Sequence, residues 1–289
     1  MTRIVYTLSA LLLFFANNNV QEEEARIWTS LMEKELVNSI ARNDLSRGIY
    51  AEVVSRLRQD GIPADFIFRT FSHPDIQIES EVEIRFNHPN EYLPYYQYRE
   101  IFINPERVSK GVKFLHEHES LINAVVDSFG IDPFLLVSIV GIASKYGDNS
   151  NQFSIFNALH TIIHKIPSKE RWVEREMIEY LEYCYRNFIP PHVIHGSYAG
   201  AFGYGQFIPS NFNYFSVDFN GDGVRHAFDW PDVLASIANY LVKNGYVRGS
   251  GDFSKNSRNW KAILAFNPLV NYVSVVLELR DELISALKD

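Results

Sequence analysis

The segment over residues 133–146 constrains the fold of this chain most strongly, because it is apolar on nearly every side. Proline is favoured at the first position of a helix, as at Pro133, and Gly147 is a typical helix stop. A helix without a polar face is stable only when other elements surround it. The chain has 289 residues, which is long enough to provide that cover. We therefore expect this segment to be a buried helix in the core of a sizeable domain.

Amphipathic periodicity predicts helices along much of the remaining chain, because apolar residues recur three and four positions apart. The expected helices cover residues 23–44, 51–59, 64–71, 109–129, 170–186, 232–244 and 273–287. Residues 76–86 instead alternate apolar and polar side chains, which predicts a half-buried strand that leads into an extended crossover. The sequence has neither internal repeats nor a parallel strand-helix-strand rhythm. The predicted fold class is therefore mainly α.

Composition excludes several classes of protein. Hydrophobic residues make up 46% of the chain and charged residues 21%, which is typical of a globular protein and not of a disordered one. The net charge of −8 disfavours a phosphate-backbone partner, so we expect no nucleic-acid binding. A single cysteine, Cys184, forms neither an intramolecular disulfide nor a cysteine cluster for zinc. Aromatic residues reach 14%, which suits dense packing or platforms for sugar rings, and composition does not separate the two.

The N-terminus has the pattern of a targeting segment. Arg3 supplies a positive charge, and the apolar run over residues 4–16 is too short to span a bilayer comfortably. We expect residues 1–20 to be a signal peptide or an N-terminal anchor, and the protein to be exported. The run lacks a small-x-small cleavage pattern, so an anchor that stays uncleaved is an alternative to a cleaved signal peptide. In that case this segment would be the only part of the protein expected to contact a membrane. An ordinary buried N-terminal helix is the alternative.

Residues 218–229 match the calcium-binding loop of an EF-hand. Oxygen-bearing side chains stand at the first, third, fifth and last loop positions, and glycine stands at the sixth. The expected calcium ligands are Asp218, Asn220, Asp222, Val224 (through its carbonyl) and Asp229. Asp229 replaces a longer glutamate that usually binds with both oxygens, which predicts a weak affinity suited to extracellular calcium. We expect a structural calcium ion here, and a solvated Asp/Asn/Gly turn is the alternative.

Residues 196–210 form a second distinctive segment, rich in glycine and alanine. Small residues let the backbone approach a ligand closely, while Tyr204 and Gln206 offer a stacking face and an amide. The segment lacks the lysine and the strand-to-helix context of a phosphate-binding loop. By its residues alone it is therefore a packing and binding segment.

Together with the buried helix, these motifs resemble the lytic murein transglycosylase B family of bacterial cell-wall enzymes. The matching stretches are Tyr98, Asn104-Pro105, Gly111, Phe114, residues 130–133, 138–142 and 196–210, the calcium loop, residues 238–240, Ala262-Ile263, Asn267 and Tyr272. The resemblance implies a lysozyme-like, glycan-binding core over residues 98–289. Residues 21–97 then form an N-terminal helical lobe and the crossover. The resemblance also implies a periplasmic or cell-envelope location.

The resemblance further implies a groove for the glycan strands of peptidoglycan. Family members cleave the strand without water: one glutamic acid protonates the leaving oxygen and then, as a base, helps the muramic 6-hydroxyl close a 1,6-anhydro ring. The groove residues that the motifs carry over are Tyr98, Ser197, Tyr204, Gln206, Tyr240, Asn267 and Tyr272. For each tyrosine taken singly, a half-buried core aromatic is an equally good interpretation.

The chain departs from the family pattern at the catalytic acid. The family places glutamate two residues after a glycine at the end of the buried helix, whereas this chain has Ala143 after Gly141. A methyl group neither donates nor accepts a proton, so that chemistry is impossible at this position. A natural loss of catalysis and a deliberate replacement of glutamate by alanine would both explain Ala143. Helix geometry turns Asp148 away, and Glu117 and Glu119 fit solvated surface charges.

Three functions agree with these observations. The first is a peptidoglycan-binding protein of the family that lacks the catalytic acid. The second is an active lytic transglycosylase, either through a substitute acid or in the form Ala143→Glu. The third is a structural or partner-binding cell-wall protein, which would contact other cell-wall proteins and whose groove would be vestigial. The first is favoured because the groove motifs are retained.

Overall fold

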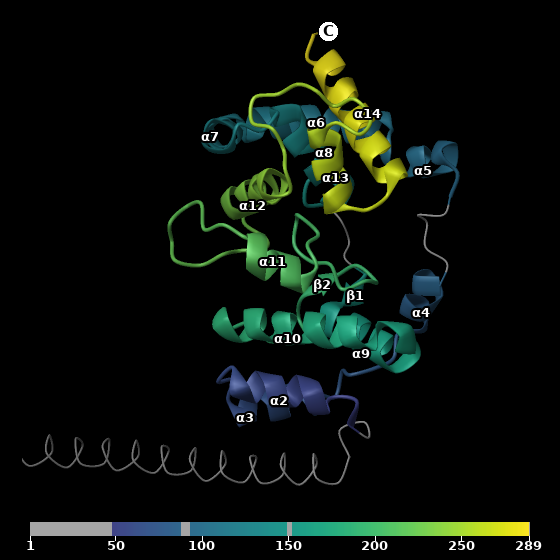
Figure 1. Ribbon diagram of the computed structural model, residues 1–289, viewed down its shortest axis with the longest axis vertical. Helices are drawn as coiled ribbons and strands as arrows, with labels where there is room; N and C mark the ends of the chain where they lie inside the picture. Colours follow the sequence, from purple (N-terminus) through teal and green to yellow (C-terminus); the bar gives the residue numbers. More distant parts are fainter. Residues whose placement is uncertain (1–47, 88–92, 149–151, 289) are drawn as a thin grey trace, which may run out of the picture. The chain divides into compact units, whose positions relative to one another are not determined.

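The computed structural model describes residues 48–87, 93–148 and 152–288 of the chain (Figure 1). Its contacts divide the chain into two compact units, with the boundary between Ile76 and Gln77. Helix α5 (Tyr95–Phe102) runs across the boundary that the sequence places between residues 97 and 98. The N-terminal targeting segment and the helix expected over residues 23–44 lie outside the described residues.

The described part of the first unit is a pair of helices. α2 (Ala51–Gln59) and α3 (Ala64–Phe71) have the predicted bounds and contact each other. Each contributes buried aliphatic side chains, and the rings of Tyr50 and Phe71 lie 4.7 Å apart. The helical periodicity of this part of the sequence is therefore confirmed.

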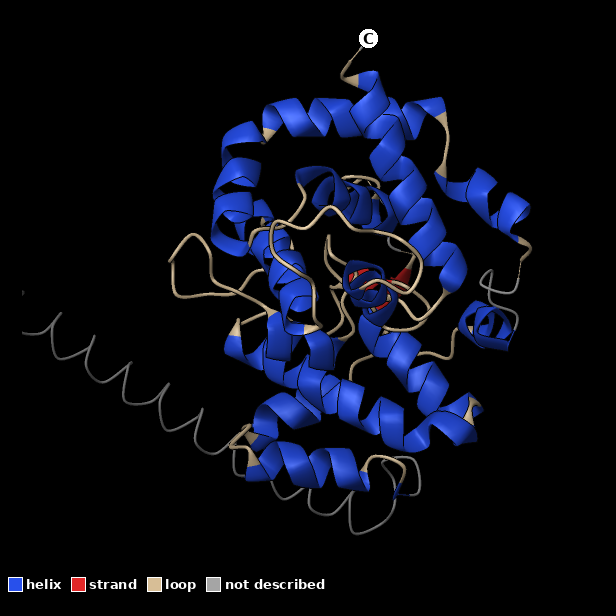
Figure 2. Cartoon of the chain, turned by 45° about the horizontal axis from the view of Figure 1, so that its top comes forward, coloured by secondary structure: helices blue, strands red, loops and turns tan. Residues whose placement is uncertain are grey.

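The second unit is built almost entirely from helices (Figure 1 and Figure 2). Besides α5, they are α4 (Ser80–Asn87), α6 (Pro105–Glu117), α7 (Glu119–Phe129), α8 (Pro133–Ser144), α9 (Ile155–Lys165), the 3-10 helix η3 (Pro167–Lys169), α10 (Glu170–Arg186), α11 (Pro209–Phe215), α12 (Trp230–Lys243), α13 (Arg258–Phe266) and α14 (Val270–Ala286). Two short strands, β1 (Phe153–Ser154) and β2 (His195–Gly196), pair antiparallel with Phe153 opposite Gly196. The mainly α fold class is confirmed.

Helix α8 has the buried position that its sequence predicts. Asp132 caps its first turn by accepting a hydrogen bond from the Leu135 N–H at 2.8 Å. Helices α6, α7, α12 and α14 all contact it, and every residue over 135–142 is buried. The helix ends at Ser144, slightly before the predicted end. Helix α8 is therefore the buried centre of the group formed with α6, α7, α12 and α14.

The strand predicted over residues 76–86 is wrong, because helix α4 covers most of that segment. Val82 and Phe86 are four residues apart, so the same residues also share one helix face. Val82 is buried, whereas Ile84, which a strand would bury on the same side, is 59% exposed. The Glu79 N–H donates to Thr161 Oγ1 at 2.9 Å, and this bond docks the segment on α9.

A second correction concerns residues 109–129, for which the sequence predicts one helix. The structure has two, α6 and α7, which meet at His118. His118 leaves the helical backbone with φ −114° and ψ 20°, and its ring lies 4.3 Å from that of Phe114. Histidine is tolerated inside helices, so the local sequence carries no signal of this bend.

Helices α5, α9, α11 and α13 are additions to the predicted inventory. Within the described ranges, no single helix is both long enough and apolar enough to cross a membrane. The bent pairs α7–α8 and α13–α14 reach that length and composition only when the two helices of a pair are counted together.

Candidate functional site

Ala143, at the position where the resemblance implies a catalytic glutamate, lies in the last turn of α8. Ala143 is partly exposed, whereas Ser144 beside it is buried. The chain then turns sharply, because Lys145, Tyr146 and Gly147 adopt positive φ angles of 53°, 61° and 89°. Ser144 Oγ accepts a hydrogen bond from the Gly147 N–H at 3.2 Å. A side chain at position 143 therefore stands at the end of a buried helix, beside a fixed turn.

Tyr146 packs behind this turn, between α6 and α8. A Cβ atom on Gly111 of α6 or on Gly141 of α8 would lie closer than 3.0 Å to Tyr146 Oη, so both positions require glycine. Burial raises the pKa of the Tyr146 hydroxyl well above its usual range, and within the described ranges this hydroxyl has no hydrogen-bond partner. The buried Arg107 donates to the Gly141 carbonyl from α6. The turn after Ala143 is therefore held by close packing.

Tyr204 contacts the same turn. A Cβ atom on Gly147 would lie 3.1 Å from the Trp230 ring and 3.4 Å from the Tyr204 ring. Tyr204 stacks on Trp230 with centroids 4.4 Å apart and an interplanar angle of 25°. Trp230 in turn contacts Phe114 and His118, at centroid distances of 4.8 and 5.8 Å. The structure thus brings Tyr204 to the end of α8 on a stack of aromatic rings.

Ser197 and Gln206 hold the glycine-rich segment in shape. Ser197 Oγ accepts hydrogen bonds from the backbone N–H groups of Ala199 (3.2 Å) and Ala201 (3.0 Å). Because a hydroxyl both accepts and donates, its proton stays available to a ligand. Gln206 has a φ of 50°, and its Nε2 donates to the Gly203 carbonyl at 2.8 Å. Both side chains are partly exposed.

The other predicted tyrosines form a buried cluster. Tyr98, Tyr240 and Tyr272 are 4%, 6% and 5% exposed. Tyr240 Oη donates to the Ala265 carbonyl at 2.7 Å. Burial raises the pKa of Tyr272, and the neighbouring phenols of Tyr98 and Tyr240 raise it further. Because so little of each side chain is exposed, the three tyrosines support the site by packing and offer little surface to a ligand.

Phe207 joins the buried cluster to the glycine-rich segment. Its ring lies 5.9 Å from that of Tyr240 and 5.3 Å from that of Phe266. Phe266 also stacks on Tyr272, with centroids 6.4 Å apart. Asn267 follows as the C-cap of α13 and is partly exposed. The segment over residues 204–207 therefore contacts both the Tyr204 stack and the tyrosine cluster.

The acids considered as substitutes for a glutamate at position 143 lie in solvent. Asp148 is 63% exposed, and its carboxylate lies 2.9 Å from Lys110 Nζ. Glu117 is exposed and pairs with Lys113 at 3.5 Å, and Glu119 is exposed in the first turn of α7. A general acid that works at neutral pH needs an apolar setting that favours its protonated form. These three exposed carboxylates have no such apolar setting.

Two buried carboxylates that support the site are missed by the sequence analysis. Glu176 of α10 accepts hydrogen bonds from the Ser210 N–H (2.8 Å) and hydroxyl (2.9 Å), which fixes the start of α11. Asp232 of α12 accepts from the N–H groups of Phe219 (2.8 Å) and His226 (2.7 Å). Asp232 thus ties together the two sides of the predicted calcium loop. A charged residue on an apolar helix face is a signal that would have found Glu176.

The predicted calcium loop turns its side chains inward. Asp218 accepts hydrogen bonds of 2.8–3.2 Å from the N–H groups of residues 221–223. Asn220 Nδ2 donates to Asp222 Oδ2 (3.0 Å) and Asp229 Oδ2 (3.1 Å), so these three side chains converge. Such oxygen donors suit calcium. In the part of the chain that the structure describes, however, no three His, Cys, Asp or Glu side chains are arranged to hold a metal ion, and calcium binding stays a prediction.

The end of this loop contacts the Tyr204 segment directly. The Tyr204 N–H donates to the Ala227 carbonyl at 2.9 Å. The Phe228 ring meets the Tyr204 ring edge-on, with centroids 5.5 Å apart. Trp230, on which Tyr204 stacks, follows the last predicted ligand, Asp229, in the sequence. The loop and the Tyr204 platform therefore form one packed assembly.

Solved structures with a similar fold include lytic transglycosylases. Slt35 of Escherichia coli in complex with bulgecin A superimposes with a TM-score of 0.74 at 22% identity, over 83% of this chain and 94% of that one. Slt35 has also been solved in complex with calcium, with the same coverage. SltB3 of Pseudomonas aeruginosa in complex with NAG-anhNAM-pentapeptide gives a TM-score of 0.73 at 23% identity, over 83% of this chain and 79% of that one. The chain thus has the lysozyme-like fold of lytic transglycosylases.

Sequence comparison identifies the family. The membrane-bound lytic murein transglycosylase B of Escherichia coli (strain K12) is 34% identical over 153 residues, which are 53% of this chain. The alignment spans 42% of that relative's length. A family profile described as Transglycosylase SLT domain matches residues 46–257. The chain therefore belongs to the transglycosylase SLT domain family, and the resemblance of its sequence to lytic murein transglycosylase B is confirmed.

Proposed function

We propose that this protein binds the glycan strands of peptidoglycan and does not cleave them by the lytic transglycosylase reaction. The observation that carries the proposal is Ala143, whose methyl group stands partly exposed where the family motif has its glutamic acid. Without a proton donor the leaving oxygen is not protonated, and without a base the muramic 6-hydroxyl is not activated. The exposed acids Asp148, Glu117 and Glu119 lack the apolar setting that this role requires.

The remaining site residues support binding. Tyr204 offers a partly exposed ring that is fixed from behind by Trp230, which suits stacking on the face of a sugar. The Ser197 hydroxyl can donate to a ligand, and the Gln206 amide is held beside it in the same segment. The SltB3 complex with NAG-anhNAM-pentapeptide supports a glycan strand as the ligand class.

The calcium loop and the N-terminal segment complete the proposal. We propose that Asp218, Asn220, Asp222, the Val224 carbonyl and Asp229 bind calcium, which is supported by the convergence of the Asn220, Asp222 and Asp229 side chains. Bound calcium would supply charge neutralisation among these carboxylates and would fix the loop. We further propose that the first 20 residues direct export to the periplasm or cell envelope, where peptidoglycan lies.

The test compares the chain with Ala143→Glu, in the presence of calcium. Binding is measured by co-sedimentation with purified peptidoglycan sacculi, and cleavage by chromatographic detection of 1,6-anhydromuramic products. We expect the chain to bind sacculi and release no such products. Ala143→Glu should bind equally well and release them, because it restores the single acid and base that the reaction needs. Ala143→Gln serves as the matched control, because its amide is similar in size to the carboxyl group of Glu but is too weak an acid to protonate the leaving oxygen.

Each other outcome points to a different function. Product release by the chain itself would overturn the proposal, because another acid would then serve. Binding without cleavage by both forms would keep the binding function and show that the groove lacks more than the acid. If neither form binds sacculi, the proposal fails, and a structural role toward other cell-wall proteins becomes the better interpretation.

A further inference from the structure

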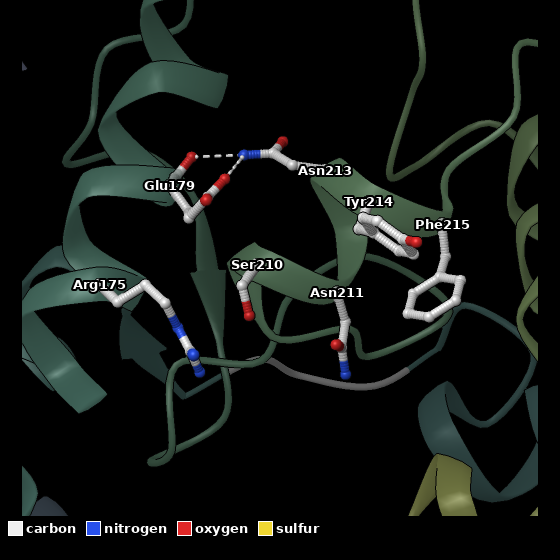
Figure 3. Close-up of a pocket in the computed structure, with 7 residues that line it drawn as sticks. All are labelled: Arg175, Glu179, Ser210, Asn211, Asn213, Tyr214 and Phe215. Carbon is white, nitrogen blue, oxygen red and sulfur yellow. Dashed lines mark hydrogen bonds between the residues drawn. The ribbon is translucent and has the colours of Figure 1, made fainter. Parts of the chain in front are cut away.

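A pocket of about 460 Å³ lies between α10 and α11, apart from the residues predicted to contact glycan (Figure 3). Arg175 and Glu179 line it from α10, and Asn211, Tyr214 and Phe215 line it from α11. The first turn of α11, beside the pocket, is held by hydrogen bonds from Ser210 to the buried carboxylate of Glu176. The pocket is therefore a built feature of two packed helices.

Tyr214 gives the pocket an aromatic surface. It is 78% exposed, which leaves most of its ring to solvent. The Phe215 ring meets it edge-on at a centroid distance of 4.7 Å and holds it from one side. A fixed, exposed ring of this kind is a stacking platform for the apolar face of a sugar.

The polar side chains of the pocket are arranged around that ring. Asn213 Nδ2 donates to Glu179 Oε2 at 2.7 Å and to the Glu179 carbonyl at 2.9 Å, which fixes the carboxylate (Figure 3). Asn211 has no side-chain hydrogen bond to any described residue, so its amide can both donate and accept. Arg175 uses Nε and Nη2 on the carboxylate of Glu176, which leaves Nη1 for a ligand.

The charges in the pocket favour a neutral ligand. The positive charge of Arg175 is balanced by Glu176, and Glu179 adds a further negative charge. A phosphate or a carboxylate would therefore be repelled more than attracted. A carboxylate, a free amide and an aromatic face together suit a ring that carries hydroxyl groups and an acetamido group.

The pocket also continues the proposed glycan site. The Phe215 ring lies 4.4 Å from the Tyr240 ring, and Asn239 Nδ2 donates to the Phe215 carbonyl at 2.8 Å. Phe215 therefore links the pocket to the tyrosine cluster by direct contact.

We infer that this pocket binds an N-acetylated sugar ring of a glycan strand, with the ring stacked on Tyr214, its acetamido group on Asn211 and its hydroxyl groups on Glu179. The inference rests on the proposed glycan-binding function and adds a subsite to it. With this subsite, Tyr214 and Asn211 would determine the length of glycan strand that the protein binds.

The test uses chitohexaose as the probe and the full chain as the protein. Calorimetry gives the affinity for the chain, Tyr214→Ala and Asn211→Ala. Phe188→Ala, which removes an exposed aromatic ring just after α10, is the matched control. Hydrogen–deuterium exchange with and without the probe follows residues 210–215 and, separately, residues 203–207 of the glycine-rich segment.

We expect Tyr214→Ala to weaken binding about tenfold, which is the loss typical of one aromatic contact, and Asn211→Ala to weaken it by a smaller factor. Phe188→Ala should leave the affinity unchanged. The probe should slow exchange over residues 210–215 in the chain and not in Tyr214→Ala. Retention of the affinity in both variants, or protection of residues 203–207 alone, would overturn the subsite while leaving the glycan-binding function intact. Absence of chitohexaose binding by the chain would overturn the subsite, and binding to sacculi tests the glycan-binding function separately.

Discussion

Gly111 and Gly141 stand on facing helices with the Tyr146 side chain between them, and neither position has room for a methyl group. The Tyr146 hydroxyl at this contact is buried without a partner among the described residues. A buried polar group without a partner lowers stability, so the ring is held there by packing and not by its oxygen. The turn after Ala143 is therefore fixed by shape complementarity.

Gly141→Ala should lower the free energy of unfolding, because the new Cβ would lie close to Tyr146 Oη. The expected loss from overpacking, about 1–3 kcal/mol, exceeds the roughly 1 kcal/mol that alanine gains over glycine as a helix former. Tyr146→Phe removes the oxygen and should raise stability by up to about 1 kcal/mol on its own and recover part of the loss in the double variant. Urea unfolding followed by tryptophan fluorescence measures each change. Gly251→Ala is the control, because a Cβ there meets nothing within 4 Å, and an equal loss in it would contradict the packing argument.

The site residues divide by how local their signals are. Ala143, Ser197, Tyr204 and Gln206 lie in motifs that a sequence shows directly, and the structure places Tyr204 against the turn after α8. Trp230 was not singled out because its importance comes from stacking on Tyr204, which is distant in the sequence. Pairings of this kind depend on the whole fold and have no local pattern.

A helix can be predicted from the sequence when its pattern of apolar residues fits a helix and does not also fit a strand or a loop. Helix α8 was predicted because a long, wholly apolar run fits few structures. Helix α4 was mistaken for a strand because Val82 and Phe86 satisfy both periods. Helix α9 was not predicted; most of its residues are buried, and polar residues such as Asn157 and Thr161 interrupt the apolar run. Both polar groups instead accept hydrogen bonds from the segment before α4.

Helix α9 should make stability depend on pH through His160. Burial, with the charge of His164 adding to it, lowers the pKa of His160 to about 4. An unfolded histidine takes up a proton near pH 6.5, whereas folded His160 does so near pH 4. Between these two values the unfolded state binds more protons, so the free energy of unfolding decreases as the pH is lowered. We expect His160→Gln to lose less melting temperature than the chain between pH 7 and pH 5. The exposed His195→Gln is the control, and identical pH profiles for all three proteins would contradict this assignment.

The calcium loop and α12 should act as one element in calcium titrations. Trp230 directly follows Asp229 in the sequence, and its ring stacks on that of Tyr204. Because the loop ends beside Trp230, ordering of the loop by calcium should change the fluorescence emission of this tryptophan. At a calcium concentration 100 times the Kd, the expected stabilisation is about 2.7 kcal/mol. Asp218→Ala should abolish both effects, and Trp230→Phe should remove the emission change while keeping the rise in melting temperature. If millimolar calcium changes neither the tryptophan emission nor the melting temperature, calcium binding at this loop is contradicted.

At the scale of the whole molecule, the net charge of −8 sets how binding can occur. The proposed contacts come mostly from the neutral side chains of tyrosine, serine, glutamine and asparagine, and the carboxylate among them, Glu179, is proposed to bind uncharged hydroxyl groups. Hydrogen bonds and stacking of neutral groups are little screened by salt, in contrast to ion pairs. An acidic protein with a neutral site therefore relies on shape and hydrogen bonding and not on long-range attraction.

Binding to purified sacculi should consequently change little between low and high salt. We expect less than about a threefold change in affinity from 50 to 500 mM sodium chloride, since few charged contacts are lost to screening. Co-sedimentation at each salt concentration with calcium held constant measures this. A steep fall in affinity would mean that charged groups of the wall are bound, and would contradict a neutral glycan site.

The end of α8 has a consequence for how long the molecule lasts. A protonatable carboxyl group in a partly buried, apolar place costs free energy, whereas alanine is the best helix former and asks for no partner. Many enzymes carry such a cost at their reactive centres. Because Ala143 has no carboxyl group, the chain does not carry this free-energy cost. The variant Ala143→Glu should therefore melt at a lower temperature than the chain. If the proposed loss of turnover holds, this gain in stability would suit a protein that stays bound to glycan strands for a long time.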